Sequence, residues 1–184
     1  MTGQLIAIVG PSGAGKDTLI GAACRTRPDL VRVRRVITRA ADPGGEPFES
    51  VDRVEFEKRR ANGAFVFWWE AHGLMYGIPH SVQTDLFAGR TVLFNASRAA
   101  LPIIMERFPN LGVIAVTAPA DTLAERLSSR GRETSEDIRG RLARADWPVP
   151  EKAHVVINDG NVEDGQAAMM RAIDAAIANN ANSE

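Results

Sequence analysis

The chain contains a single cysteine, Cys24, among its 184 residues. One cysteine allows no intrachain disulfide bond and excludes a metal site built on two thiolates. We expect Cys24 to be a small buried side chain on the first helix. No apolar stretch reaches the ~20 residues that a membrane-spanning helix needs, and no basic and apolar leader opens the sequence. The sequence therefore predicts no membrane partner and a cytoplasmic setting.

Net charge is also almost absent, at a formal −1 at pH 7. Such a chain has no general attraction for nucleic acid, so no nucleic-acid partner is expected. Arginines nevertheless gather at residues 32–39 and 126–144, which suits small phosphorylated ligands. Internal repeats and low-complexity linkers are missing, and 45% of the residues are hydrophobic. We expect residues 1–184 to form one domain, whose oligomeric state the sequence leaves open.

A phosphate-binding loop is the strongest signal that the sequence does contain. An apolar run at residues 5–9 predicts a strand, and the glycine-rich loop after it ends on Lys16, where a helix is expected to begin. Glycines let backbone N–H groups turn toward an anionic oxygen, the helix N-terminus adds positive potential, and the lysine reaches the outer phosphates. The residues expected to bind ATP are Gly10, Pro11, Ser12, Gly13, Ala14, Gly15, Lys16, Asp17 and Thr18.

One position departs from the usual pattern of such loops. The lysine is usually followed by a hydroxyl residue that holds Mg²⁺, whereas Asp17 follows Lys16 and the hydroxyl comes later, at Thr18. A carboxylate beside bound phosphates is repelled unless a cation lies between them. We therefore hypothesise that Asp17 holds Mg²⁺, directly or through its waters. The alternative is an ordinary acidic residue in a first helical turn, where the helix dipole favours it.

Strand and helix signals alternate along the rest of the chain. Helices are predicted near residues 17–25, 51–61, 81–88, 99–108, 121–129, 135–145 and 163–178. Extended segments are predicted at residues 31–37, 65–69, 91–94, 113–117 and 154–157, and turns at 42–47, 76–79 and 158–161. This alternation predicts an α/β fold with a mostly parallel sheet covered on both faces. Ligands should bind at the carboxyl ends of its strands.

Motifs spread over nearly the whole chain resemble, in order, those of guanylate kinases. They are the P-loop, Ile37-Thr38-Arg39, Gly45-Glu46, Tyr76-Gly77, residues 126–131, Arg141-Leu142 and Asn158-Asp159. The resemblance implies a P-loop nucleoside-monophosphate-kinase-like three-layer fold, with an acceptor-binding insertion at about 34–90 and a helical lid at about 126–145. The positions that would read guanine and hold its phosphate differ from the guanylate kinase pattern. They are residues 40–42, 47–50 and Phe67-Trp68.

Other segments are similar to the ribose 1,5-bisphosphate phosphokinase family. They are residues 15–17, 37–39, 44–46, 69–77 and 95–102. That family transfers a phosphoryl group from ATP to the 1-phosphate of ribose 1,5-bisphosphate, giving 5-phosphoribosyl 1-diphosphate and ADP, often in phosphonate metabolism. The resemblance implies a phosphotransferase that uses ATP and Mg²⁺ and takes a small phosphorylated sugar.

The resemblance also implies roles for particular residues. Lys16 and Asp17 would act with the lid arginines Arg126, Arg130 and Arg141 on the transferred phosphoryl group. Asn158 would lie against the adenine of ATP, although a turn or helix cap explains it equally well. The residues implied to bind the acceptor are Arg39, Glu46, His72, Tyr76, Asn95 and Arg98.

Ordinary structural roles remain open for several of these side chains. The lid arginines could belong to a solvated helix face paired with nearby acidic residues. Arg39 could be a surface charge beside Arg34 and Arg35, and His72 a surface residue. The aromatic run at residues 65–69 is expected to pack in the core.

A phosphate acceptor needs no general base, because it is already anionic near neutral pH; positioning and charge neutralisation then suffice. Two other functions remain open at this point. One is a guanylate or other nucleoside-monophosphate kinase, and the other is a catalytically inactive binding module with the same fold.

Overall fold

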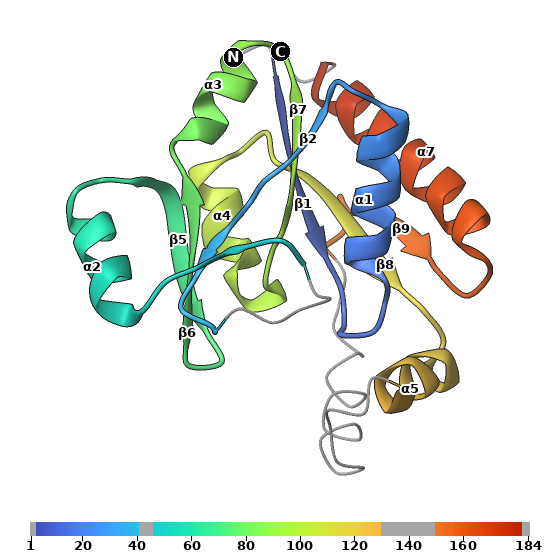
Figure 1. Cartoon of the computed structure of the whole chain (residues 1–184). Coiled ribbons are helices and arrows are strands. Elements are labelled where there is room, and N and C mark those ends of the chain that lie inside the picture. Colours follow the sequence, from blue (N-terminus) through green and yellow to red (C-terminus); the bar gives the residue numbers. More distant parts are fainter. Residues whose placement is uncertain (1–2, 41–45, 130–149, 182–184) are drawn as a thin grey trace.

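A five-stranded parallel sheet lies at the centre of the structure, a computed structural model that describes residues 3–40, 46–129 and 150–181 (Figure 1). Its strand order is β2-β7-β1-β8-β9. The strands are β1 (Gln4–Val9), β2 (Leu30–Arg32), β7 (Thr91–Asn95), β8 (Gly112–Thr117) and β9 (His154–Ile157). The central strands are buried almost throughout, which explains their continuous aliphatic sequences.

Helices cover both faces of this sheet because successive side chains of a strand point to opposite sides. Ile6 and Ile8 of β1 pack with α1 (Lys16–Thr26) and α7 (Val162–Ala181), which lie against each other. Leu5, Ala7 and Val9 pack with α3 (Ser81–Phe87) and α4 (Leu101–Arg107). The short 3-10 helix η1 (Arg98–Ala100) leads into α4, and α5 (Ala120–Ser129) follows β8.

A second sheet stands beside the first, in the order β4-β3-β6-β5. Its strands are β3 (Val36–Ile37), β4 (Glu49–Ser50), β5 (Phe65–Ala71) and β6 (Leu74–Pro79). The helix α2 (Arg53–Ala61) packs on it through Phe56, whose ring stacks on Phe65 at 4.7 Å between centroids. Strands β5 and β6 form an antiparallel hairpin, so this part of the chain differs in topology from the parallel sheet.

The predicted α/β fold with a mostly parallel sheet is confirmed, but two local predictions were wrong. Residues 76–79 are the last four residues of β6 and not a turn. Gly77 and Pro79 suggested a turn, yet a Cβ at Gly77 would lie 2.6 Å from the Phe65 ring, so glycine serves packing there. Residues 31–37 are not one segment: the chain leaves the parallel sheet after β2 and enters the second sheet at β3.

Strand β4 was not predicted, and the other described elements agree with the predictions within a few residues. The predicted helix at 135–145 lies outside the described residues. Cys24 is half-buried and not fully buried; it packs beside the α1–α7 side of the core, and burial raises the pKa of its thiol. No described helix is both long and apolar enough to cross a membrane.

The small core under α2 predicts a stability effect. Phe56 is fully buried, so Phe56→Ala should lower the free energy of unfolding by about 3–5 kcal/mol through lost burial and a residual cavity. Val54 on the same helix is 80% exposed, and Val54→Ala should change it by less than about 0.5 kcal/mol. Urea unfolding of both variants measures the difference, and equal small effects would contradict the described packing.

Candidate active site

The P-loop joins the carboxyl end of β1 to the first turn of α1, and close backbone contacts fix its path. Gly10 has φ +148°, and a Cβ there would lie 2.0 Å from the carbonyl oxygen of Val116 in β8. Gly15 has φ +84°, and a Cβ there would lie 2.3 Å from Nδ2 of Asn158. Both positions therefore require glycine. The loop borders a cavity of about 80 Å³ lined by Ser12, Gly13, Gly15, Lys16, Asp17 and Thr18.

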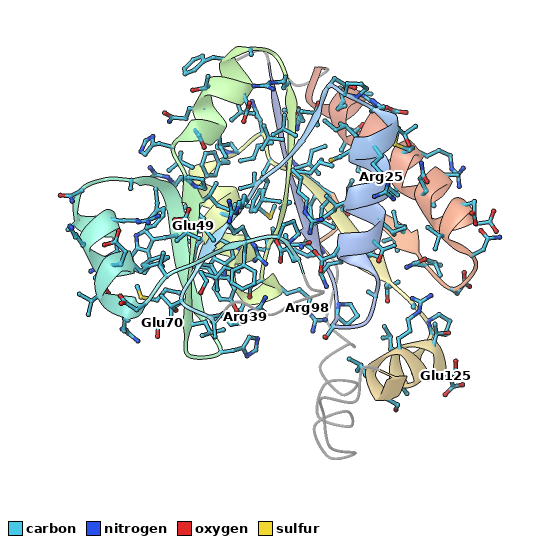
Figure 2. The ribbon with its side chains drawn as sticks, in the orientation of Figure 1. Arg25, Arg39, Glu49, Glu70, Arg98 and Glu125 are labelled. Atoms are coloured by element: carbon cyan, nitrogen blue, oxygen red, sulfur yellow. The ribbon has the colours of Figure 1, made fainter. Side chains whose placement is uncertain are left out.

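The ammonium group of Lys16 lies inside this loop. Its Nζ donates to the carbonyl oxygens of Gly10 at 3.0 Å and Pro11 at 2.8 Å. Burial lowers the pKa of Lys16 to about 8; nearby Asp17 and Glu46 oppose this shift, while Arg35 and Arg98 add to it. Arg98 lies in η1, just beyond the carboxyl end of β7 (Figure 2). The predicted site residues Asp17, Glu46 and Arg98 thus share one electrostatic environment with Lys16.

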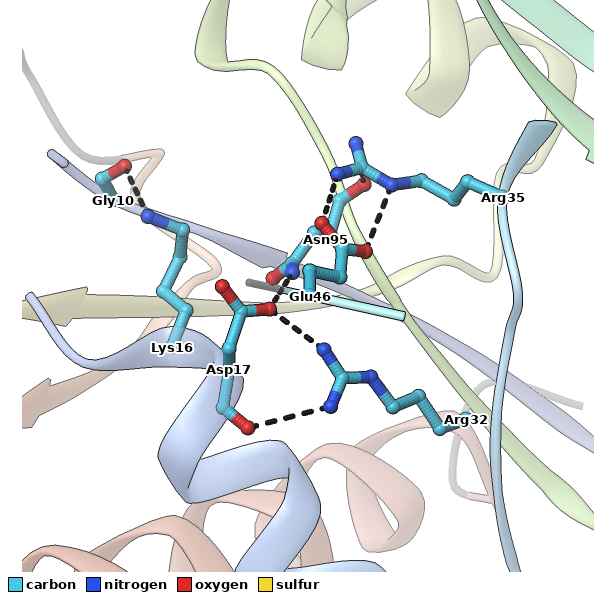
Figure 3. A network of polar contacts seen from close by, with 7 residues as sticks. All are labelled: Gly10, Lys16, Asp17, Arg32, Arg35, Glu46 and Asn95. Carbon is cyan, nitrogen blue, oxygen red and sulfur yellow. Dashed lines mark hydrogen bonds and ion pairs between the residues drawn. The ribbon is translucent and has the colours of Figure 1, made fainter. Parts of the chain in front are cut away.

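The carboxylate of Asp17 joins three segments of the fold (Figure 3). Its Oδ1 accepts from Nη2 of Arg32 at 2.7 Å and from Nδ2 of Asn95 at 2.6 Å. Arg32 lies at the end of β2, Asn95 at the end of β7, and Asp17 in the first turn of α1. Oδ2 has no hydrogen-bond partner among the described residues, and the side chain is 47% exposed. One carboxylate oxygen thus fixes the helix start, and the other is available.

Arg35 extends this network toward the acceptor side. Its Nη1 donates to the backbone carbonyl of Asn95 at 3.0 Å. Its Nε donates to Oε1 of Glu46 at 3.0 Å, and its Nη2 donates to Oε2, which makes the ion pair bidentate. The guanidinium carbon also lies 5.9 Å and 5.2 Å from the ring centroids of Trp69 and Tyr76. Those two rings stack in parallel, 5.1 Å apart at 7°, and we call them the Trp69–Tyr76 stack.

Asn158 supports the P-loop from behind. Its Nδ2 donates to the carbonyl oxygen of Ala14 at 2.8 Å, and its backbone N–H donates to Thr117 at 2.7 Å. Its backbone carbonyl accepts from Nη1 of Arg126 in α5 at 2.9 Å. The amide is buried and already engaged with the loop, so this structure gives Asn158 a supporting position next to the predicted ATP site. The other predicted lid residues, Arg130 and Arg141, lie outside the described residues.

The predicted acceptor residues fall into two groups. Glu46, Tyr76, Asn95 and Arg98 lie in or next to the network around Lys16 and Arg35. Arg39 and His72 lie at exposed positions. The Arg39 guanidinium covers the Phe48 ring at 4.4 Å, and His72 sits at φ 54° in the β5–β6 turn. The structure therefore brings together most of the predicted set but places His72 at the tip of a hairpin.

Three residues of the network were missed as individual site residues in the sequence: Arg32, Arg35 and Trp69. The arginine cluster at 32–39 was the available signal, but the pattern gave no reason to separate buried Arg35 from exposed Arg34. The predicted core role of the aromatic run is confirmed for Phe65, Phe67 and Trp69, which are buried, whereas Trp68 is 38% exposed under Arg60.

The described ranges contain no group of three or more His, Cys, Asp or Glu side chains that could enclose a metal ion. Mg²⁺ held between a protein and a nucleotide uses only one or two carboxylates and takes its other ligands from phosphates and water. Asp17, with one oxygen available at the mouth of the P-loop, fits such a site.

Comparisons with known proteins show the family and the fold. A family model described as guanylate kinase matches residues 2–176. A ribose 1,5-bisphosphate phosphokinase of Rhizobium etli is 45% identical over 96% of this chain and 92% of its own length. One from Acidiphilium cryptum is 49% identical, over 92% of this chain and 91% of its own. A bifunctional ribose 1,5-bisphosphokinase-thymidine phosphorylase of Cupriavidus necator is 44% identical, but the match covers only 29% of that protein.

Among solved structures, guanylate kinase from Anaplasma phagocytophilum superposes with a TM-score of 0.64. The match covers 94% of this chain and 85% of that one at 22% identity, so it shows a shared fold and no more.

Titration of Lys16 gives a test of its place in the loop. Above a pH of about 8 the free protein has lost part of this charge, whereas bound phosphates favour the charged form. We expect ATP binding to take up a proton as the pH rises through about 8, and the affinity to fall with further increase. Calorimetry in two buffers with different ionisation enthalpies measures the uptake. Lys16→Arg stays charged over this range and should show none; equal uptake in both proteins would contradict the assignment.

Proposed function

The chain belongs to the guanylate kinase family and, within it, to the ribose 1,5-bisphosphate phosphokinases, and we propose on this basis that it phosphorylates ribose 1,5-bisphosphate with ATP. The products are 5-phosphoribosyl 1-diphosphate and ADP. One structural observation carries the choice of acceptor: the guanidinium of Arg35 lies beside both rings of the Trp69–Tyr76 stack, 5.9 Å and 5.2 Å from their centroids. A guanidinium thus lies against the aromatic rings on which a base would need to stack.

Binding of ATP follows from the P-loop. Backbone N–H groups at the start of α1 and the ammonium of Lys16 face the cavity that receives the phosphates. Arg126 approaches the same region through Asn158, and we propose that Arg130 and Arg141 join it over the transferred group. Several fixed positive charges around the phosphoryl group stabilise the charge that develops during transfer.

The acceptor phosphate is the nucleophile, and it carries negative charge near neutral pH. No side chain has to remove a proton from it, so the protein's task is to hold two anions in line. We propose that Arg39 and Arg98 hold the acceptor phosphate, and that Asn95 and Tyr76 border the sugar. The segment at about 34–90, which contains the second sheet, then forms the acceptor-binding part of a single domain.

We further propose that Asp17 positions Mg²⁺ through its Oδ2 or through a metal-bound water, because Oδ1 is already bonded to Arg32 and Asn95. Held there, the ion would supply charge neutralisation for the nucleotide phosphates.

The guanylate kinase alternative is disfavoured by the residues on the acceptor side. Phe67, at one of the places that would read guanine, is 7% exposed and packs against Trp69 and Phe108. An inactive binding module is disfavoured by the P-loop, whose glycines, lysine and supporting Asn158 are all in place.

The proposal is tested by ADP release from ATP and Mg²⁺ with ribose 1,5-bisphosphate, with GMP and without an acceptor. We expect turnover with the ribose ester alone, and a product heavier by one phosphoryl group in its mass spectrum. Turnover with GMP would return the chain to the guanylate kinases. No ADP release with either acceptor would contradict the proposed activity.

The role of Asp17 predicts a metal effect. Asp17→Asn keeps an oxygen that can accept from Arg32 and Asn95 but removes the negative charge. We expect the Mg²⁺ concentration for half-maximal activity to rise by about tenfold or more, as for other residues that hold a metal or its waters. Asp29→Asn alters a carboxylate that pairs with Arg27 at the far end of α1, and serves as the control. An unchanged Mg²⁺ titration in Asp17→Asn would refute this role.

A further inference from the structure

Arg35 is a buried charge whose presence the transfer reaction does not by itself explain. The residue is 8% exposed, and the side chain of its partner Glu46 is equally enclosed. Moving two ions out of water is costly, and apolar residues of similar size often stabilise a core as well as a buried ion pair does. Stability alone is therefore a poor reason for this pair, and its position on the acceptor side suggests binding.

The hydrogen bonds of Arg35 are incomplete. A guanidinium has five N–H bonds, of which one bonds to Asn95 and two bond to Glu46. The other two, one on each terminal nitrogen, have no partner among the described residues. Glu46 thus fixes the orientation of the guanidinium without using all of the guanidinium's N–H donors.

Two further buried atoms, on residues that contact Arg35, also lack partners in the described part of the chain. Nε1 of Trp69, in the ring under the guanidinium, donates to no described group, and Oδ1 of Asn95, whose backbone carbonyl Arg35 binds, accepts from none. Buried polar groups are normally paired, so unpaired ones in a binding region point to a ligand. Arg35 and two residues that it contacts thus carry three N–H donors and one acceptor without a partner among the described residues.

This set of groups matches a phosphorylated sugar. Phosphate oxygens accept from a guanidinium fork and an indole N–H, and a sugar hydroxyl donates to an amide oxygen. Arg35 also lies near enough to Lys16 to act on its charge, so a ligand held there lies within electrostatic reach of the P-loop. The acceptor proposed above has two phosphates, and only one of them reacts.

We propose that Arg35, held by Glu46 on the Trp69–Tyr76 stack, binds the phosphate of the acceptor that does not react and thereby selects a doubly phosphorylated sugar. This inference rests on the proposed function, because it assigns a role within that same acceptor site. Asn95 Oδ1 then accepts from a hydroxyl of the sugar between the two phosphates.

The test compares ribose 1,5-bisphosphate with ribose 1-phosphate, which keeps the reacting phosphate and lacks the other. The double variant Arg35→Gln/Glu46→Gln removes both charges, so neither is left buried alone. The ratio of kcat/KM for the two acceptors should fall by about tenfold or more, as expected for a lost charge-assisted contact. Arg35→Lys keeps the charge but loses the fork, and the ratio should fall there too. Arg34→Gln changes the exposed neighbour and should leave the ratio as in the wild type.

Ribose 5-phosphate gives a second readout, since it carries only the phosphate that does not react. It should inhibit the wild type in competition with the bisphosphate, and its inhibition constant should rise in both Arg35 variants. An equal loss of kcat/KM with both acceptors, together with an unchanged inhibition constant for ribose 5-phosphate, would show a structural role and overturn the inference. If the double variant fails to fold, Arg35→Lys decides by the same two readouts. A wild type that turns over neither ribose ester would instead refute the proposed function itself.

Discussion

The carboxylate of Asp17 is the junction on which the arrangement of the polar site depends. Its Oδ1 binds Arg32 and Asn95, and the backbone carbonyl of Asn95 binds Arg35. A continuous series of hydrogen bonds therefore runs from the first turn of α1 to the second sheet (Figure 3). Because α1 carries the P-loop lysine, these hydrogen bonds link the ATP-binding side of the site to the acceptor-binding side and fix their relative positions.

This junction also explains why an acidic residue is compatible with a phosphate-binding loop. An unpaired carboxylate there would repel the phosphates, but Asp17 shares its charge with the guanidinium of Arg32. Its exposed oxygen can then bind a cation, while the ion pair with Arg32 limits the repulsion between the carboxylate and the phosphates. Lys16, Arg35 and Arg98 add positive charge to the same region. The balance favours small ligands that carry several phosphates.

The sequence alone predicted the P-loop and nearly all of the parallel sheet, because each depends on local signals. The loop needs glycines and a lysine at fixed spacing, and strands such as β1 and β8 are buried apolar runs. Residues 76–79 were misjudged because Gly77 meets the Phe65 ring across the hairpin, a contact that no local pattern reveals.

The acceptor side was harder to predict because its contacts join residues far apart in the sequence. Arg35 is buried by Glu46, by Asn95 and by the Trp69–Tyr76 stack, whereas its neighbour Arg34 is exposed. Nothing in a run of arginines distinguishes the two. Family resemblance identified Glu46, Tyr76 and Asn95 as candidates, but their mutual arrangement required the fold. The lid residues Arg130 and Arg141 stay predictions.

The central claim is that the phosphoryl group goes to a phosphate and not to a hydroxyl, which is why no general base is required. Phosphorus NMR of the purified product distinguishes the two directly, since both products have the same mass. Transfer to the 1-phosphate predicts two mutually coupled signals from a diphosphate, beside one unchanged monophosphate signal. Three separate, uncoupled monophosphate signals would show transfer to a sugar hydroxyl and would contradict the mechanism.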